Sequence, residues 1–124
     1  MTDVQARSRA AHQKAVEFSV ADIARFLQET LGQKLVAYIA TVSDPKAVGD
    51  WARGVHAPRP ESEQRLRTAF HVFHLLQNEE SPHTVRAWLV GVNPQLDDET
   101  PVDAIREGRL KDVVVAAKAY IAGG

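Results

Sequence analysis

Apolar residues recur along this chain at the three- and four-residue spacing of amphipathic helices, and no segment alternates over the length of a strand. The stretch 20–31 is the clearest case. Its apolar stripe comprises Ile23, Phe26, Leu27 and Leu31. The longest predicted helix covers 61–79, and its inner stripe comprises Leu66, Phe70, Phe73, Leu76 and Gln77. The pattern therefore predicts an all-α fold, a small helical bundle.

Proline and glycine mark where the other helices begin and end. These helices are predicted over 35–39, 45–53, 82–90, 101–107 and 110–121. Asp44, Ser81 and Thr100 each precede a proline, and residues of these types cap a helix whose first position suits proline. Residues 1–17 lack a strong period, so we expect only a weak helix over 10–16 within a mobile N-terminal segment.

Length and composition limit the classes of protein that this chain can represent. Its 124 residues suffice for one domain, or for two very small ones that share a core, and 44% hydrophobic with 25% charged residues predicts folding rather than disorder. The absence of cysteine excludes disulfides, thiolate metal sites and a cysteine nucleophile. No stretch approaches the roughly 20 apolar residues of a membrane span, and the N-terminus lacks a signal core, so we expect a soluble cytoplasmic protein without a membrane partner.

The C-terminal residues 86–124 carry an ordered set of features: a tryptophan, an Asn-Pro pair, a Thr-Pro pair, a glycine and a closing amphipathic helix. This order resembles the toxin-binding module of the Xre/MbcA/ParS antitoxins. The matching positions are Arg86, Ala87, Trp88, Leu89, Asn93, Pro94, Leu96, Thr100, Pro101, Val102, Ile105, Gly108 and Val113. One departure is the acidic run 97–99, where many relatives have a small or glycine-containing turn. Such carboxylates favour the start of the next helix more than a cation site.

Residues 35–54 resemble the helix-turn-helix of Xre-type regulators. Val48 lies three residues before Trp51, and Gly54 lies three after it, which puts Val48 and Trp51 on an inner face. The positions predicted to face outward are Lys46, Gly49, Asp50 and Arg53. The resemblance makes this helix the recognition helix, which enters the major groove of DNA.

Basic side chains on and after this helix are the DNA-binding candidates, namely Lys46, Arg53 and Arg59. Asp50 on the same side would repel phosphate, and a formal net charge of −1 is no signature of a polyanion-binding protein. The sequence therefore leaves open whether the helix-turn-helix binds operator DNA or serves only as a scaffold.

Together the two resemblances divide the chain into the mobile segment 1–17, a helix-turn-helix-like domain over 18–80 and a toxin-binding domain over 81–124. They imply the antitoxin of a type II toxin-antitoxin system, whose cognate toxin carries a RES domain and consumes NAD. The antitoxin would block the toxin sterically with its last helix and tail, form homodimers and toxin-antitoxin hetero-oligomers, and repress its own operon. The toxin-binding residues that the resemblance implies are Val114, Lys118, Tyr120, Ile121, Gly123 and Gly124.

The alternative is a free-standing Xre-type transcriptional regulator that uses the C-terminal module for dimerisation. An enzyme is disfavoured, because the sequence offers no phosphate-cradling glycine loop, nucleophile elbow or Glu-x-x-His ligand pair, and it indicates no cofactor. His71 and His74 lie three apart on one helix, but a metal site needs a third ligand that the sequence does not place nearby. The sequence identifies neither the toxin, nor the operator, nor the stoichiometry of the complex.

Overall fold

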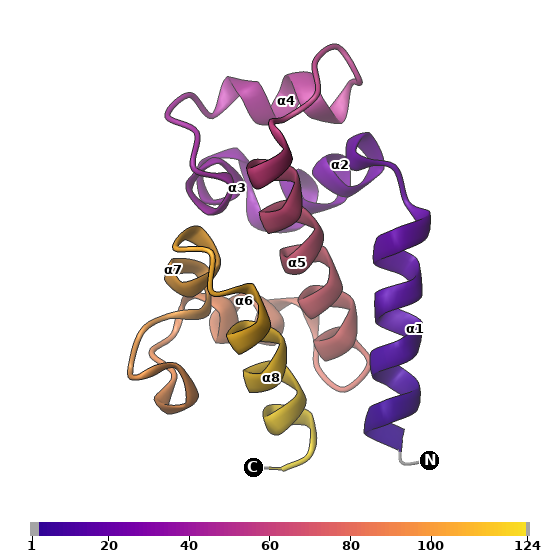
Figure 1. Cartoon of the computed structure of the whole chain (residues 1–124), viewed down its shortest axis with the longest axis vertical. Helices are drawn as coiled ribbons and strands as arrows, with labels where there is room; N and C mark the ends of the chain where they lie inside the picture. Colours follow the sequence, from indigo (N-terminus) through magenta and orange to yellow (C-terminus); the bar gives the residue numbers. More distant parts are fainter. Residues whose placement is uncertain (1–2, 124) are drawn as a thin grey trace.

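The computed structural model describes residues 3–123, apart from the side chains of residues 10 and 12–17. In that range eight α-helices and one 3-10 helix follow one another without a strand, which confirms the predicted all-α bundle (Figure 1). The elements are α1 (Asp3–Glu17), α2 (Val20–Leu31), α3 (Gln33–Ala40), α4 (Lys46–Ala52), α5 (Pro60–Gln77), α6 (Pro82–Val90), η1 (Pro94–Leu96), α7 (Pro101–Arg106) and α8 (Leu110–Ile121). None of these helices combines the length and the apolar character that a membrane span requires.

α1 is a helix of 15 residues that begins much earlier than the sequence indicated. The prediction of a weak helix confined to 10–16 was wrong, because packing against another helix stabilises a segment whose own pattern is weak. α1 lies along α5 (Figure 1), and its residue Ala11 is buried. An ion pair joins Arg7 of α1 to Glu79, just beyond the end of α5. Tertiary contacts therefore define this helix.

Predicted caps occur where two of the C-terminal helices begin. The backbone N–H of Thr84 donates to the Ser81 hydroxyl at 3.2 Å, and that of Asp103 donates to the Thr100 hydroxyl at 3.1 Å. In both helices proline follows the cap. Gly108 follows α7 with a φ of 86°, a left-handed conformation that glycine adopts without strain. Local chemistry thus sets these boundaries.

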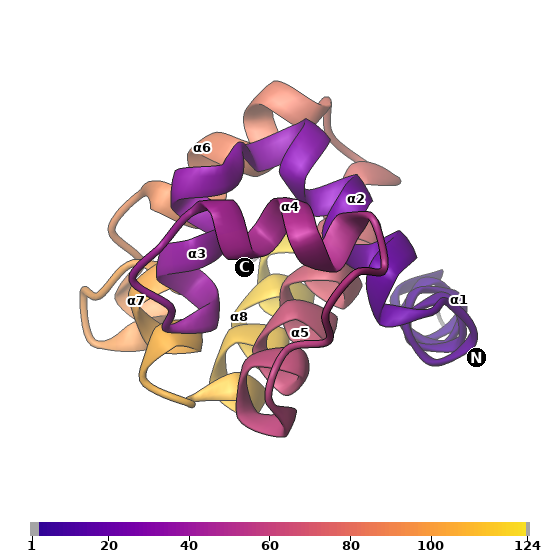
Figure 2. The ribbon, with the colours of Figure 1, turned by 90° about the horizontal axis from the view of Figure 1, so that it is seen from above.

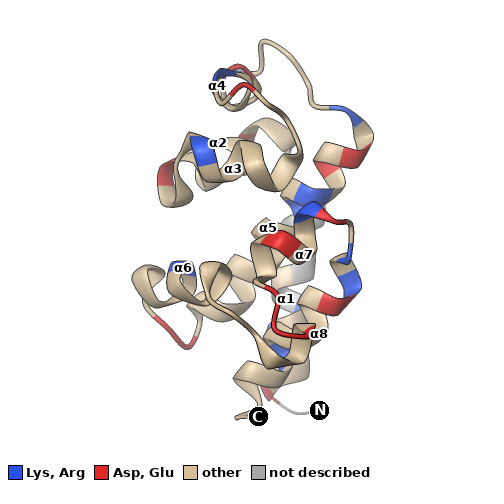
Figure 3. Ribbon diagram, turned by 90° about the vertical axis from the view of Figure 1, so that its left-hand side faces the viewer, with Lys and Arg blue, Asp and Glu red and all other residues tan. Residues whose placement is uncertain are grey.

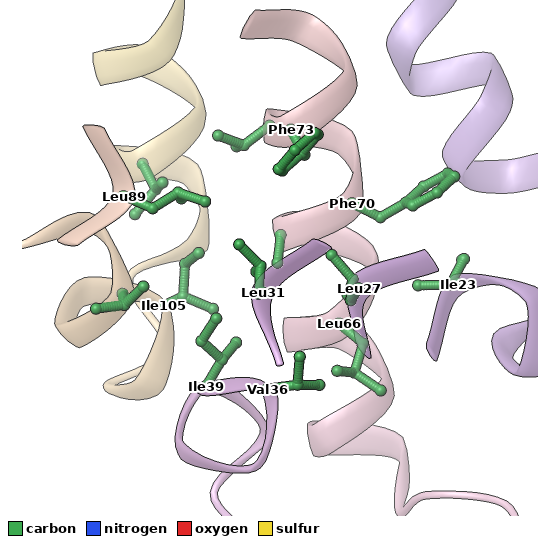
Figure 4. Close-up of a cluster of buried hydrophobic side chains, with 14 of the residues drawn as sticks. Ile23, Leu27, Leu31, Val36, Ile39, Leu66, Phe70, Phe73, Leu89 and Ile105 are labelled. Atoms are coloured by element: carbon green, nitrogen blue, oxygen red, sulfur yellow. The ribbon is translucent and has the colours of Figure 1, made fainter. Parts of the chain in front are cut away.

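One hydrophobic core joins the segment 18–80 to the segment 81–124. α5 lies at its centre and contacts α1, α2, α3, α6, α7 and α8 (Figures 1 and 2). Side chains from both segments meet around α5 (Figure 4), and the labelled ones are Ile23, Leu27, Leu31, Val36, Ile39, Leu66, Phe70, Phe73, Leu89 and Ile105. Because residues of α6 and α7 are buried beside residues of α2 and α3, the two segments pack as one unit.

A polar junction also ties the two segments together. Arg106 of α7 places its guanidinium carbon 4.4 Å from the centre of the Tyr38 ring in α3, and donates a hydrogen bond of 2.6 Å to the Tyr38 carbonyl. The Tyr38 hydroxyl donates to the Asp103 carboxylate, and this bond raises the pKa of Tyr38. We call Tyr38, Asp103 and Arg106 the Tyr38 junction. It adds directional contacts to the shared core.

If the two segments unfold as one unit, their tryptophans should report the same transition. Trp51 lies in α4 and Trp88 in α6, so Trp88→Phe and Trp51→Phe leave one fluorescent probe in each segment. Urea unfolding followed by fluorescence should coincide with circular dichroism in both variants. Adding Ile105→Ala, at a buried position, should lower the free energy of unfolding by about 2 to 5 kcal/mol and shift both probes together. A shift of the Trp88 transition alone would show that the segments unfold separately.

The Tyr38 junction predicts a pH dependence. Tyr120→Phe leaves Tyr38 as the sole tyrosine, and its absorbance titration should lie above the ordinary tyrosine value of about 10. Because folding raises this pKa, the junction contributes to stability in full below the unfolded value, and the contribution is lost as the pH rises through the folded value. Asp103→Asn should move the titration back towards 10. An unchanged midpoint in that variant would mean that Asp103 does not hold the phenol.

Candidate functional site

α8 turns one face to the core and another to solvent. Its buried residues are Val113, Ala116 and Ala117. Val115 is 61% exposed and Tyr120 is 39% exposed, so two large apolar side chains of this last helix remain outside the core. The two residues are five positions apart, about 140° around the helix, so they face different directions, and each is open to a partner.

The predicted toxin-binding residues fall into two groups. Val114 and Ile121 pack against the core as partly buried residues. Lys118 is also half-buried, whereas Tyr120 and Gly123 are exposed. Gly124 lies outside the described residues. Part of the predicted surface therefore supports the fold, and the part near Tyr120 is open to a partner.

Tyr120 is held in place by contacts from two other parts of the chain. Its hydroxyl donates a hydrogen bond of 2.8 Å to Glu80, which raises the pKa of Tyr120. Its ring packs edge-to-face with Trp88 of α6, with the ring centres 6.3 Å apart. An aromatic side chain that is already ordered loses little conformational entropy when a partner binds it.

A cleft of about 380 Å³ lies beside Tyr120, between α6, η1 and α8. Its lining includes Trp88, Val92, Pro94, Gln95, Ala116 and Tyr120. Val92 is 69% exposed, and the sequence pattern singled out neither Val92 nor Val115. A signal for Val115 existed, because residues 113–115 are three consecutive valines and a helix cannot turn all three towards one core.

Asn93 shapes the turn next to this cleft. Its side-chain oxygen accepts a hydrogen bond of 2.9 Å from the backbone N–H of Gln95, and its own N–H donates at 2.9 Å to the Glu99 carbonyl. Arg109 forms ion pairs with Asp97 at 3.5 Å and with Glu99 at 3.2 Å. The acidic run is therefore balanced by a cation of the same module.

The histidine pair of α5 lies among aromatic side chains. His71 and His74 are both half-buried, and the His74 ring stacks on Phe26 with the ring centres 4.8 Å apart. Among the described residues, no group of three or more His, Cys, Asp and Glu side chains is placed to hold a metal ion.

The predicted DNA-binding residues surround α4. Lys46 begins the helix, Arg53 follows its last residue, and Arg59 lies in the connector to α5. Asp50 pairs with Arg53 at 2.5 Å and lies 3.7 Å from His56, so the Arg53 charge is partly neutralised. Lys46 and Arg59 form no ion pair within the described range and are exposed. Figure 3 shows both signs of charge on α4.

The expectation that Gly49 faces outward was wrong. Gly49 is buried, and a Cβ at this position would lie 3.0 Å from the Gln33 side-chain nitrogen. α4 therefore approaches the start of α3 closely, and its outward surface is narrower than the sequence predicted. A groove of about 670 Å³ runs beside it, and Thr41, Asp44, Trp51, Arg59 and Arg65 are among its lining residues.

Comparison with known proteins tests the resemblance. The chain is 38% identical over 88 residues to a protein of Mycobacterium tuberculosis described as "Probable mycobacterial cidal antitoxin", and the match covers 71% of this chain and 74% of that protein. No family profile matches the chain, and no solved structure matches it. The match confirms that the chain is related to an antitoxin. With this identity over most of both sequences, the chain belongs to the family of this mycobacterial cidal antitoxin.

Proposed function

We propose that this antitoxin binds and sterically blocks a cognate RES-type toxin that consumes NAD. The observation that supports the proposal most is that α8 leaves Tyr120 exposed beside the cleft that Trp88 also lines. A residue such as Val115 has no partner in the core, and its burial against another protein would be favourable. NAD would then be a ligand of the toxin, and this chain would need no cofactor of its own.

The proposed mechanism is occlusion rather than chemistry. Tyr120 would serve as the anchor, because an ordered aromatic ring with a polar end is typical of residues that dominate binding energy. Lys118, Gly123 and Gly124 would follow it into the entrance of the toxin's active site. Val114 and Ile121 would contribute mainly by holding α8 on the core.

The proposal is tested by point substitutions rather than by truncation, since deleting 118–124 would also remove Ile121 from the core. Tyr120→Ala should weaken the toxin complex by about 2 kcal/mol, a roughly thirtyfold increase in Kd. Val115→Asp should reduce toxin neutralisation further, because it puts a charge into an apolar interface. Calorimetry with the neighbouring gene product and growth rescue of cells that express it would measure these effects.

Val55→Asp is the matched control, because Val55 is 59% exposed and lies in the other segment. It should neutralise the toxin as the unsubstituted protein does. Full neutralisation by Tyr120→Ala with Val115→Asp would contradict the proposed interface. Failure of the unsubstituted chain to bind the neighbouring gene product would instead favour a free-standing transcriptional regulator.

We further propose that the antitoxin binds its own operator through α4 and acts as a homodimer within the toxin-antitoxin hetero-oligomer. The unpaired, exposed cations Lys46 and Arg59 beside the α4 groove support DNA binding. Phe70 and Phe73 are buried within the chain, so a dimer would use other residues. If the helix-turn-helix serves only as a scaffold, these cations have no nucleic-acid partner.

Asp50→Asn tests operator binding through an expected increase in affinity, which a variant that fails to fold would not produce. The substitution removes a negative charge that faces the phosphates and releases Arg53 from its ion pair. We expect about threefold to tenfold tighter binding to a duplex from the region upstream of the gene, and a steeper salt dependence. Electrophoretic retardation at several salt concentrations measures both. Weaker or unchanged binding would show that α4 does not face the DNA.

A further inference from the structure

A second groove, separate from the α4 groove and from the Tyr120 cleft, runs between the α2–α3 turn and α6. It encloses about 570 Å³. Its lining includes Leu31, Gln33, Lys34, Leu35, Tyr38 and Arg86. Lys34 and Arg86 are the charged residues of this lining, both are exposed, and neither forms an ion pair with a described residue. Unbalanced positive charge in a concave surface attracts an anionic partner.

Lys34 and Arg86 join Lys46 and Arg59 as exposed cations that form no ion pair with a described residue, whereas other arginines of this chain pair with carboxylates. Such pairs occupy Arg7, Arg25, Arg53, Arg67 and Arg109. Tyr38 also lines the groove, and the carboxylate of the Tyr38 junction, Asp103, accepts a hydrogen bond from the Tyr38 hydroxyl. Arg106 lies over the ring of Tyr38 and adds a third cation near the groove. The fold uses Arg106 in the Tyr38 junction, so the cations that this groove leaves for a ligand are Lys34 and Arg86.

The groove lies on a different side of α6 from the Tyr120 cleft. Arg86 and Trp88 are two residues apart, which is about 200° around a helix, so α6 presents Arg86 to this groove and Trp88 to the cleft. Figure 3 shows basic stretches on α4, α3 and α6, with acidic stretches beside them, and α8 towards the other side of the molecule. The basic residues of those three helices are Lys46, Lys34 and Arg86.

We propose that this groove binds the phosphate backbone of duplex DNA, so that Lys34 and Arg86 extend the α4 surface into the C-terminal module. The inference rests on the proposed operator binding. Three cations in a row over three helices match the repeated charge of a nucleic-acid backbone. A toxin held at α8 would leave this side accessible, which favours DNA over an acidic face of the same toxin. Because Asp50 weakens the positive charge of α4, operator affinity would depend on these additional phosphate contacts.

The test is fluorescence anisotropy of the full chain with a labelled duplex from the region upstream of its gene, over a series of salt concentrations. Lys34→Ala with Arg86→Ala should weaken binding about tenfold or more at low salt. It should also reduce the slope of log K against log salt by about two, since each neutralised phosphate contributes about 0.9. Arg9→Ala with Lys111→Ala is the control, because it removes the same charge from exposed positions on α1 and α8. Circular dichroism should be unchanged in both double variants, and toxin neutralisation should be unchanged in the groove variant.

The outcomes separate this inference from the proposed function. If the groove variant binds the duplex as the control does, while Lys46→Ala weakens binding, the operator proposal stands and the groove inference is overturned. If the groove variant loses toxin binding instead of DNA binding, the partner of the groove is an acidic protein surface, and the inference is again overturned. If the unsubstituted protein does not bind the duplex at any salt concentration, operator binding and the groove inference both fail, and toxin neutralisation is judged from its own assay.

Discussion

α5 is buried on several sides at once, and the rest of the structure depends on this burial. α5 contacts α2 and α3 of the segment 18–80 as well as α8 of the C-terminal module, and its residues Leu66 and Phe73 are buried in the core. Two small helical units that would each bury little surface alone thereby share one core. The Tyr38 junction then restricts how α3 and α7 can move relative to each other. The surfaces on either unit consequently keep a fixed relative position.

The shared core also decides which residues are left for partners. The aromatic residues Phe70 and Phe73 of α5 are used internally, and in the C-terminal module the exposed large apolar residues are Val90, Val92, Val115 and Tyr120. Ion pairs within the protein likewise decide which charged side chains remain available to a partner. Arg109 balances the acidic run and Arg53 is paired with Asp50, whereas Lys34, Lys46 and Arg86 have no carboxylate partner in the described part of the chain. An antitoxin built this way would meet a toxin on its apolar side and a polyanion on its basic side.

Several features of this protein were determined by the sequence alone, because their causes are local. Ser81 and Thr100 cap the helices that follow them, since a hydroxyl oxygen needs only the next turn of backbone to accept its hydrogen bond. The stripe of α2 predicted the buried side chains Ile23, Leu27 and Leu31, since three- and four-residue spacing alone places them on one face. The ordered motifs of 86–124 indicated an antitoxin, and the mycobacterial relative confirmed this coarser assignment.

Other features were decided only by the tertiary structure, because they depend on residues far apart in sequence. α1 is helical from Asp3 because α5 supports it, and Gly49 is buried because α4 packs closely on Gln33. No local pattern could place Lys34 and Arg86 in one groove, since they are brought together by the packing of α6 near the α2–α3 turn. The exposure of Val92 and the neutralisation of Arg53 likewise follow from neighbours that folding supplies. The sequence determined the helices from α2 onwards and indicated an antitoxin, and the packing around α5 determined α1 and the surfaces that remain free to bind.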